Sequence, residues 1–287
     1  MNIDYPKVYS YADDKSAKKQ KWYFRLLILE YSFLFIIALN SFLSYERKFI
    51  VSFILIAVLV AFFFLKKIFS LASEWYKYRA LAESVKTTCW RYVMRAEPFN
   101  NSDQCDNYEE FKNSLVDTIK DSNVIPKKIK PEILNNSTVT DSMRAIELLS
   151  LEEKKSIYLK ERIEDQYNWY TRKSTYNKRM AKKWSLFIVS LYILALLFSF
   201  YNIFYHSLFI FPVAVLTTLA SAFIGWSQIK RYEELQASYL LTAGEILGIK
   251  EQVHYISNDS QLSSFVRDAE LAFSREHTQW TARRSSS

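Results

Sequence analysis

Glycine is almost absent from this chain. Its 287 residues include three glycines, Gly225, Gly244 and Gly248. A P-loop needs two glycines before a Lys-Ser/Thr pair, and a dinucleotide-binding turn needs three glycines close together. These positions can build neither, so both kinds of nucleotide site are excluded. A chain with so few glycines and with five prolines favours long uninterrupted helices.

Cysteine and histidine are also scarce. The two cysteines, Cys89 and Cys105, form no CxxC pair, and we interpret them as reduced structural thiols. The three histidines, His206, His254 and His277, are scattered without the spacing of metal ligands. We therefore expect no metal site and no cofactor.

Apolar residues, by contrast, make up 50% of the chain and aromatic residues 17%, which excludes disorder for most of it. A helix needs about 20 apolar residues to cross the hydrocarbon layer of a membrane. Residues 186–205 and 208–228 both meet this length without a formal charge. A buried hairpin of a soluble protein is the alternative, but the 46 residues from Trp184 to Ile229 carry no formal charge at all. We therefore predict a pair of membrane spans here.

A weaker pair of spans comes earlier in the chain. Residues 49–65 are free of charge, whereas residues 26–45 contain Glu30 and Asn40. The fold class that follows is an all-α membrane protein with two two-span helical hairpins, extended by long cytoplasmic helices. An alternative keeps the first hairpin shallow in the membrane because of its two polar residues.

Lysine and arginine clusters indicate the orientation. They precede residue 26, follow residue 65, precede residue 186 and follow residue 228. By the positive-inside rule, both termini and the middle of the chain are cytoplasmic, and the hairpin tips near Ser44 and His206 face outward. The net charge of +8 then indicates anionic lipid rather than nucleic acid as the acidic partner, and no direct nucleic-acid binding is expected.

The segments beyond the spans look helical and repeated. No glycine or proline occurs from Phe49 to Met94, so one helix of about 69 Å is possible there. Gly244 and Gly248 are four residues apart, which favours close helix packing over a local weakness. An ungapped alignment with an offset of 154 residues predicts an internal repeat; its matched pairs are Tyr78 with Tyr232, Leu81 with Leu235, and Ser84 with Ser238. Trp22 and Trp184 match at a slightly different offset.

The predicted organisation has three parts: a first two-span domain (1–110), a cytoplasmic linker with short helices (111–149), and a second two-span domain with a C-terminal cytoplasmic helix (150–287). Ser150 and Glu153 form a capping box that begins a helix running into the third span. The mixed charges of residues 151–174 are interpreted as a solvated helix face.

Three strings resemble tandem SLATT proteins, whose domains are SMODS- and SLOG-associating two-transmembrane effector domains. They are YRALAESVKTTCWRYVMRAEPF (78–99), LEEKKSIYLKERIEDQYNWYTRKS (151–174) and FSREHTQWTARR (273–284). The resemblance implies a bacterial inner-membrane effector of a conflict system, which oligomerises and perturbs the membrane. It also implies a nucleotide-second-messenger synthase, a nucleotide-sensing protein or a reverse-transcriptase system as partner.

Several polar residues within the spans are candidates for a pore. Glu30 is either an interfacial or protonated carboxylate, or one of a ring that lines a cation-selective pore. Asn40 offers an interhelical hydrogen bond or a polar pore face. Thr217, Ser221 and Gly225 recur every four residues and indicate close helix packing or, less simply, a pore face.

Residues beyond the spans are candidates for binding. Tyr78, Arg79, Arg231 and Tyr232 could hold an anionic nucleotide, although an interfacial belt of aromatic and basic residues is simpler. The C-terminal helix carries an approximate apolar stripe, with Glu270 placed off it; its members are Phe265, Ala269, Ala272, Phe273 and Trp280. Ser274 and His277 lie three apart without an oxyanion site, so no catalysis is expected. Arg267, Arg275, His277 and Trp280 are candidates for contact with a partner.

Three functions compete at this point. The first is a pore-forming or membrane-disrupting effector, and the second is a non-conducting membrane anchor that recruits a cytoplasmic enzyme. A transporter is the third, and it is disfavoured because no pair of interrupted apolar segments marks a midplane site.

Overall fold

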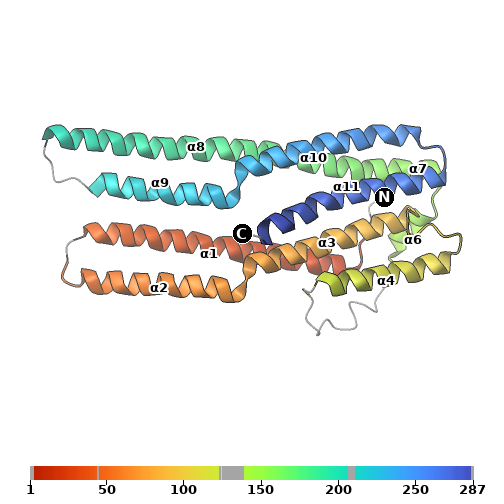
Figure 1. Ribbon diagram of the computed structural model, residues 1–287, viewed down its shortest axis with the longest axis horizontal. Coiled ribbons are helices and arrows are strands. Elements are labelled where there is room, and N and C mark those ends of the chain that lie inside the picture. Colours follow the sequence, from red (N-terminus) through yellow and green to blue (C-terminus); the bar gives the residue numbers. More distant parts are fainter. Residues whose placement is uncertain (1–2, 44, 123, 125–138, 206–210, 286–287) are drawn as a thin grey trace. The chain divides into compact units, whose positions relative to one another are not determined.

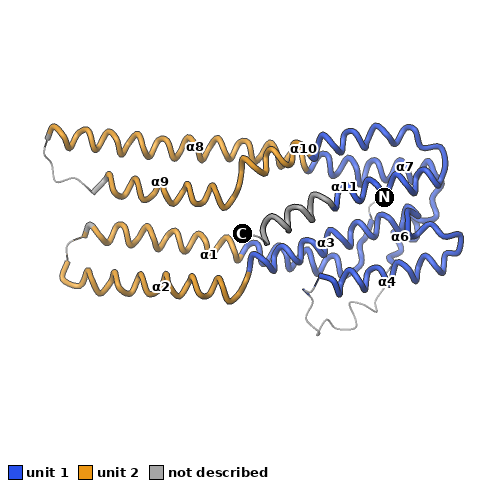
Figure 2. The backbone as a smooth tube through the Cα atoms, in the orientation of Figure 1, with its two compact units in different colours: residues 1–21, 71–169, 242–287 blue, residues 22–70, 170–241 orange. Residues whose placement is uncertain are grey.

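The computed structural model describes residues 3–43, 45–122, 124, 139–205 and 211–285, and these residues are helical with no strand among them (Figure 1). They form two compact units (Figure 2). We call residues 1–21, 71–169 and 242–287 the head unit, and residues 22–70 and 170–241 the span unit. Each unit combines segments from both halves of the sequence.

The helices follow one another through both units. Their bounds are α1 Lys7–Phe42, α2 Lys48–Phe69, α3 Leu71–Val93, α4 Gln104–Ser122, α6 Asp141–Glu147, α7 Leu151–Ile157, the π-helix η1 Tyr158–Glu164, α8 Asp165–Tyr205, α9 Phe211–Lys230, α10 Tyr232–Gln252, the 3-10 helix η2 Val253–Tyr255 and α11 Asp259–Ser285. The predicted capping box is confirmed at the start of α7, where the amide of Ser150 donates to Glu153 Oε2 at 3.0 Å.

The span unit contains two antiparallel hairpins, α1 with α2 and α8 with α9. In the described residues, three helical stretches are long and apolar enough to cross a membrane: Lys7–Ser41, Lys48–Val93 and Leu151–Phe204. These stretches are longer than a bilayer is thick, and their polar parts, such as α3, extend into the head unit. The predicted span 208–228 begins within residues 206–210, outside the described residues, and the rest of it lies in α9. The all-α membrane fold is confirmed.

Helix α2 of the span unit has an apolar exterior. Helix α2 has no buried residue. Phe49 is 81% exposed, Phe53 74% and Ile68 72%. Soluble monomers rarely expose so large a contiguous apolar surface, whereas a lipid-facing helix must.

Two breaks interrupt the long helices, contrary to the continuous helix predicted from Phe49 to Met94. Ser70 separates α2 from α3 with φ 42°, and Arg231 separates α9 from α10 with φ 53°. The amide of Ser70 still bonds to Lys66 O at 3.2 Å, and that of Arg231 to Ser227 O at 2.9 Å. The chain turns because each residue adopts the left-handed region, which side chains other than glycine normally avoid.

The two breaks also fix the register of the internal repeat. The two breaks are 161 residues apart. A side-chain hydrogen bond recurs after each break, and its two acceptor residues are also 161 positions apart. Ser16 Oγ donates to Trp75 O at 3.5 Å, and Ser174 Oγ donates to Gln236 O at 2.9 Å. Both serines lie in the helix that leads into a hairpin, and both acceptors lie on the helix that leaves it.

A pair of aromatic rings repeats in the same register. Tyr11 and Tyr78 lie edge to face with centroids 6.3 Å apart, and Tyr170 and Tyr239 do so at 5.6 Å. Tyr239 therefore occupies the place of Tyr78 in the second half. The alignment of Tyr78 with Tyr232 was wrong by seven residues, which is two helical turns and so preserves the apolar pattern.

The head unit has a core in which α3 and α11 pack together. Helix α3 turns Leu81, Val85 and Cys89 inward at spacings of four residues. Val266, Ala269 and Phe273 are buried on α11 at spacings of three and four residues. Trp90 and Tyr158 pack edge to face in the centre, with ring centroids 5.6 Å apart.

Candidate functional site

The carboxylate of Glu30 in α1 is paired across the first hairpin. It forms an ion pair with the ammonium of Lys66 in α2, and both side chains are about a quarter exposed. An ion pair lowers the cost of placing a carboxylate within an apolar span. In the sequence, Lys66 stands out only as one of the basic residues that follow the second predicted span.

Asn40 joins the two helices of the same hairpin near its tip. The side chain is buried at 5% exposure, and its amide donates to Ser52 Oγ at 2.8 Å and to Lys48 O at 3.4 Å. Its carbonyl oxygen accepts the hydroxyl of Tyr45. Asn40 thus makes the interhelical hydrogen bond that was the simpler of its two interpretations.

The small residues of α9 have different environments. Thr217 Oγ1 donates to Val213 O at 3.0 Å, and Ser221 Oγ donates to Thr217 O at 2.9 Å, so both hydroxyls bond within their own helix. Gly225 packs against α1, where a Cβ atom added to it would lie 2.6 Å from the hydroxyl oxygen of Tyr31. Gly225 therefore provides the close helix approach that its spacing predicted.

Of the four residues predicted as an exit belt, two belong to each unit. In the head unit, Tyr78 is 7% exposed and donates to Val124 O at 3.3 Å. Burial, with help from Tyr11 and Glu74, raises the pKa of Tyr78 to about 12. The guanidinium of Arg79 lies 5.8 Å from the ring centroid of Trp169. Tyr78 and Arg79 are thus held by internal contacts.

In the span unit, Arg231 and Tyr232 sit at the second break. Arg231 forms a bidentate pair with Glu234, with Nε–Oε2 at 2.5 Å and Nη2–Oε1 at 2.6 Å. Tyr232 is 6% exposed. Both residues line a groove of about 520 Å³ between α8 and the α9–α10 junction.

The centre of the head unit holds a buried ion pair that sequence reasoning missed. Arg162 on η1 is 1% exposed and Glu270 on α11 is fully buried. Arg162 Nε lies 2.7 Å from Glu270 Oε1, and Nη2 lies 2.6 Å from Oε2. Tyr158 donates to Oε1 at 3.0 Å, and Thr87 donates to Oε2 at 2.9 Å. One carboxylate of α11 therefore accepts four hydrogen bonds from α3 and η1.

This arrangement corrects two interpretations. Arg162 does not lie on a solvated face, and Glu270 does not lie off the apolar stripe of α11. The signal was present in the sequence, because Glu270 stands between Val266 and Phe273 at helical spacing. A charge in that position needs a partner of opposite sign.

Electrostatics around the pair are strongly perturbed. Burial opposes the charged guanidinium, but the contact with Glu270 outweighs it and raises the pKa of Arg162. Burial, and then the neighbouring charge of Arg162, lower the pKa of Lys86. Burial also raises the pKa of the Cys89 thiol, with a smaller contribution from Glu270. A protonated thiol is a poor nucleophile. The hydrogen bonds of this centre instead hold α3, η1 and α11 together.

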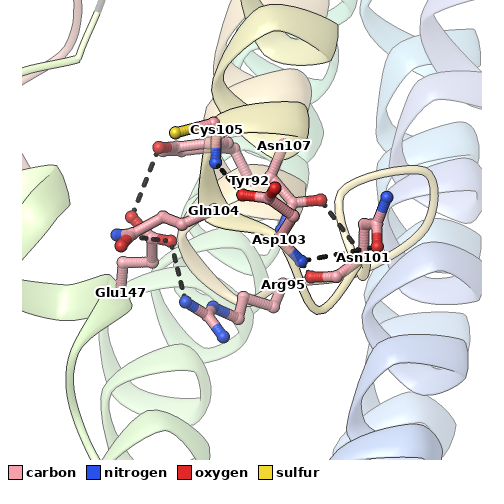
Figure 3. Close-up of polar contacts among 8 residues, drawn as sticks. All are labelled: Tyr92, Arg95, Asn101, Asp103, Gln104, Cys105, Asn107 and Glu147. Carbon is pink, nitrogen blue, oxygen red and sulfur yellow. Dashed lines mark hydrogen bonds and ion pairs between the residues drawn. The ribbon is translucent and has the colours of Figure 1, made fainter.

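A second polar cluster surrounds Glu147 at the end of α6 (Figure 3). Glu147 is 3% exposed. It accepts hydrogen bonds from Tyr92, Arg95 and Gln104, each at 3.3 Å. Burial, and then the charge on Glu147, raise the pKa of the Tyr92 hydroxyl. The cluster ties α3, α4 and α6 together.

The predicted contact residues of α11 divide into two groups. Arg267 Nη1 pairs with Glu97 Oε2 at 2.7 Å, and its Nε pairs with Asp268 Oδ1 at 2.9 Å. Arg275, His277 and Trp280 fall within the bounds of α11, but their side chains lie outside the described residues. Within the described part of the chain, no group of His, Cys, Asp and Glu residues could hold a metal ion.

Two family models match the chain in tandem. SMODS and SLOG-associating 2TM effector domain 3 (SLATT_3) matches residues 6–155, which is more than half of the chain, and domain 1 of the same series (SLATT_1) matches residues 158–280. The chain belongs to the SLATT family. The predicted resemblance is confirmed. Comparisons of this SLATT protein with curated proteins and with solved structures each returned no match.

Membership explains the layout of the span unit. Each matched region contains one hairpin, α1–α2 in the first and α8–α9 in the second. A two-transmembrane effector domain in each half implies a membrane effector in conflict systems. The geometry adds that Glu30 and Asn40 are paired within the first hairpin and that the head unit is built around a buried ion pair.

Proposed function

We propose that this SLATT protein is a membrane effector of a prokaryotic anti-phage system. In this proposal several copies assemble in the inner membrane and open a pore, or disrupt the bilayer, when a nucleotide signal or a sensor partner triggers them. The observation that carries the proposal is the contrast within the span unit between paired polar groups and an exposed apolar exterior. A resting chain of this kind is compatible with an intact membrane.

The contrast gives a reason for assembly. Glu30, Asn40, Thr217 and Ser221 all have partners within the span unit. The apolar side chains of a single chain therefore face lipid. These four polar residues are already paired, so they do not offer ions a polar path across the membrane. A polar path needs surfaces from more than one copy, and α2, which has no buried residue, offers an apolar surface for contact between copies.

The decisive experiment measures leakage from liposomes that contain the purified full-length chain. Leakage of ions or dye is expected only with an activating nucleotide or partner. In the active state, Glu30→Gln should change the ratio of cation to anion permeability, measured as a reversal potential. Glu46→Gln, an exposed carboxylate near the tip of the same hairpin, is the matched control. No leakage with any tested nucleotide or partner would contradict conduction.

The alternative is a non-conducting membrane anchor that recruits a cytoplasmic enzyme. The size of the head unit favours it, since that unit comprises residues from three separate segments and forms its own core. In this case the head unit should retain a partner enzyme in co-purification, and liposomes should stay sealed while the partner is bound. We propose no catalytic activity for the chain itself under either function.

Both proposals share one topology. The head unit and both termini lie in the cytoplasm in this proposal, which the basic residues that flank the spans support. Labelling of single cysteines introduced at Ser44 and His206 tests this, because both positions should react from outside the cell. Both lie outside the described residues. Reaction only after the membrane is permeabilised would reverse the assigned orientation.

A further inference from the structure

The groove at the second break has an amphipathic lining. At one end, Ile188 of α8 and Ile224 of α9 form apolar walls. At the other end, Ser227, Arg231 and Glu233 contribute a hydroxyl, a guanidinium and a carboxylate. The apolar end lies within the spans and the polar end at the α9–α10 junction. A membrane lipid has its acyl chains and headgroup in the same order.

The break itself creates the polar end. Arg231 adopts φ 53°, a conformation that is unfavourable for a residue other than glycine. Strained backbone of this kind concentrates at functional sites. Here the left-handed turn starts α10 with two consecutive glutamates, Glu233 and Glu234, in its first turn.

The charges of this end select for a particular headgroup. Arg231 uses Nε and Nη2 to bind Glu234, so Nη1 takes no part in that pair and can donate to a phosphate oxygen. Glu233 is exposed and adds a second carboxylate beside a single guanidinium. A ligand with an anionic phosphate next to a cationic primary ammonium complements this arrangement. An anionic headgroup without an ammonium would give Glu233 no cationic partner, and a quaternary ammonium could not donate a hydrogen bond to it.

We propose that this groove binds one phospholipid with an ethanolamine headgroup. Its phosphate accepts from Arg231 and Ser227, its ammonium donates to Glu233, and an acyl chain lies along Ile188 and Ile224. The volume of about 520 Å³ is within the range of small-molecule sites, which suits a headgroup and the upper part of one chain. The proposal does not depend on conduction, because an anchor would need the same contact.

The test measures retained lipid. The full-length protein is equilibrated with vesicles of phosphatidylethanolamine, phosphatidylcholine or phosphatidylglycerol, purified again in detergent and examined by native mass spectrometry. We expect one phosphatidylethanolamine per chain. Because a charge-assisted hydrogen bond separates the lipids, its retention should exceed that of the other two by about tenfold.

Three variants make the test specific. Glu233→Gln should remove the preference for ethanolamine, whereas Glu251→Gln, an exposed carboxylate near the other end of α10, should keep it. Ile188→Trp should fill the groove and remove retention of all three lipids, with an unchanged circular dichroism spectrum as the check on folding. Equal retention of the three lipids would overturn the proposal, and so would an unchanged lipid preference in Glu233→Gln. A third contrary result is that the groove variants change only the number of protein chains in the complex.

Discussion

Glu270 is the residue on which the head unit depends most. Its carboxylate is fully buried and accepts hydrogen bonds from Thr87, Tyr158 and Arg162. Removing one partner of such a pair leaves an uncompensated buried charge, which costs about 3–5 kcal/mol. Replacing both partners by apolar residues of similar volume often costs little.

We therefore expect Glu270→Gln to lower the stability of the head unit by about 3–5 kcal/mol, measured by denaturant unfolding in detergent. The combined change Arg162→Met and Glu270→Leu should recover most of this loss. Glu251→Gln is the exposed control and should have little effect. A loss in Glu270→Gln no larger than that of the control would show that the pair is not essential.

The two cysteines should differ in reactivity. Cys89 is buried with a raised pKa, and Cys105 is exposed. At neutral pH a maleimide should label Cys105 in the native protein and Cys89 only after denaturation, as mass spectrometry can show. Rapid native labelling of Cys89 would mean that the α3–α11 core opens readily.

Cys89 should also contribute to the pH dependence of stability. Its thiol stays protonated in the folded state, whereas an unfolded thiol ionises above about pH 8.5. Unfolding then releases a proton, so stability falls as pH rises above this value. Cys89→Ala should make the fall between about pH 8.5 and 10 shallower. An identical slope in the variant would contradict the assigned burial.

At the scale of helices, substitution by alanine should change stability in one direction at Gly244 and Gly248 and in the other direction at Gly225. No atom lies within 4 Å of a Cβ added at Gly244 or Gly248. Alanine there should raise stability by about 0.5–1 kcal/mol each, since glycine weakens a helix interior. Gly225→Ala should instead destabilise the span unit, because its Cβ meets Tyr31.

A second substitution identifies the cause at Gly225. Tyr31→Phe removes the hydroxyl, and the next atom of that ring lies 3.4 Å from the added Cβ, an ordinary contact. The double variant Gly225→Ala with Tyr31→Phe should therefore be more stable than Gly225→Ala alone, measured by thermal unfolding in detergent. Stabilisation by Gly225→Ala alone would show that the helices separate easily.

The helices themselves were largely predictable, and their breaks were not. Apolar runs of about 20 residues without charge identify the hairpins, because such runs are typical of membrane spans and rare in other structures. Ser70 and Arg231 carry no such mark, since neither residue type favours the left-handed region. The sequence showed that a repeat exists but not its register. A shift of seven residues is close to two helical turns, so the wrong register aligned apolar positions equally well.

At the scale of the whole molecule, the two regions that match family models do not coincide with the two compact units. The family models separate residues 6–155 from 158–280, whereas the head unit draws on both regions. Arg267 and Ser263 of the second region both contact Glu97 of the first. Sequence patterns could not show this, because the contacts join residues more than 160 positions apart and no local signal marks them.

A cut between the matched regions should therefore disrupt the head unit. Neither fragment, 1–156 or 157–287, should show the cooperative unfolding of the full chain. When the two fragments are produced together they should associate, and Glu270→Gln should weaken that association. Two fragments that each unfold cooperatively on their own would show that the halves are independent.

The position of α11 also sets the order of events during synthesis. Thr87 emerges from the ribosome long before Glu270, and both hairpins precede Glu270 in the chain. Membrane insertion of both hairpins therefore precedes closure of the α3–α11 core. Until translation reaches α11, the nascent effector sits in the bilayer without a completed head unit, so any restraint that this unit exerts begins only when the polypeptide is nearly finished.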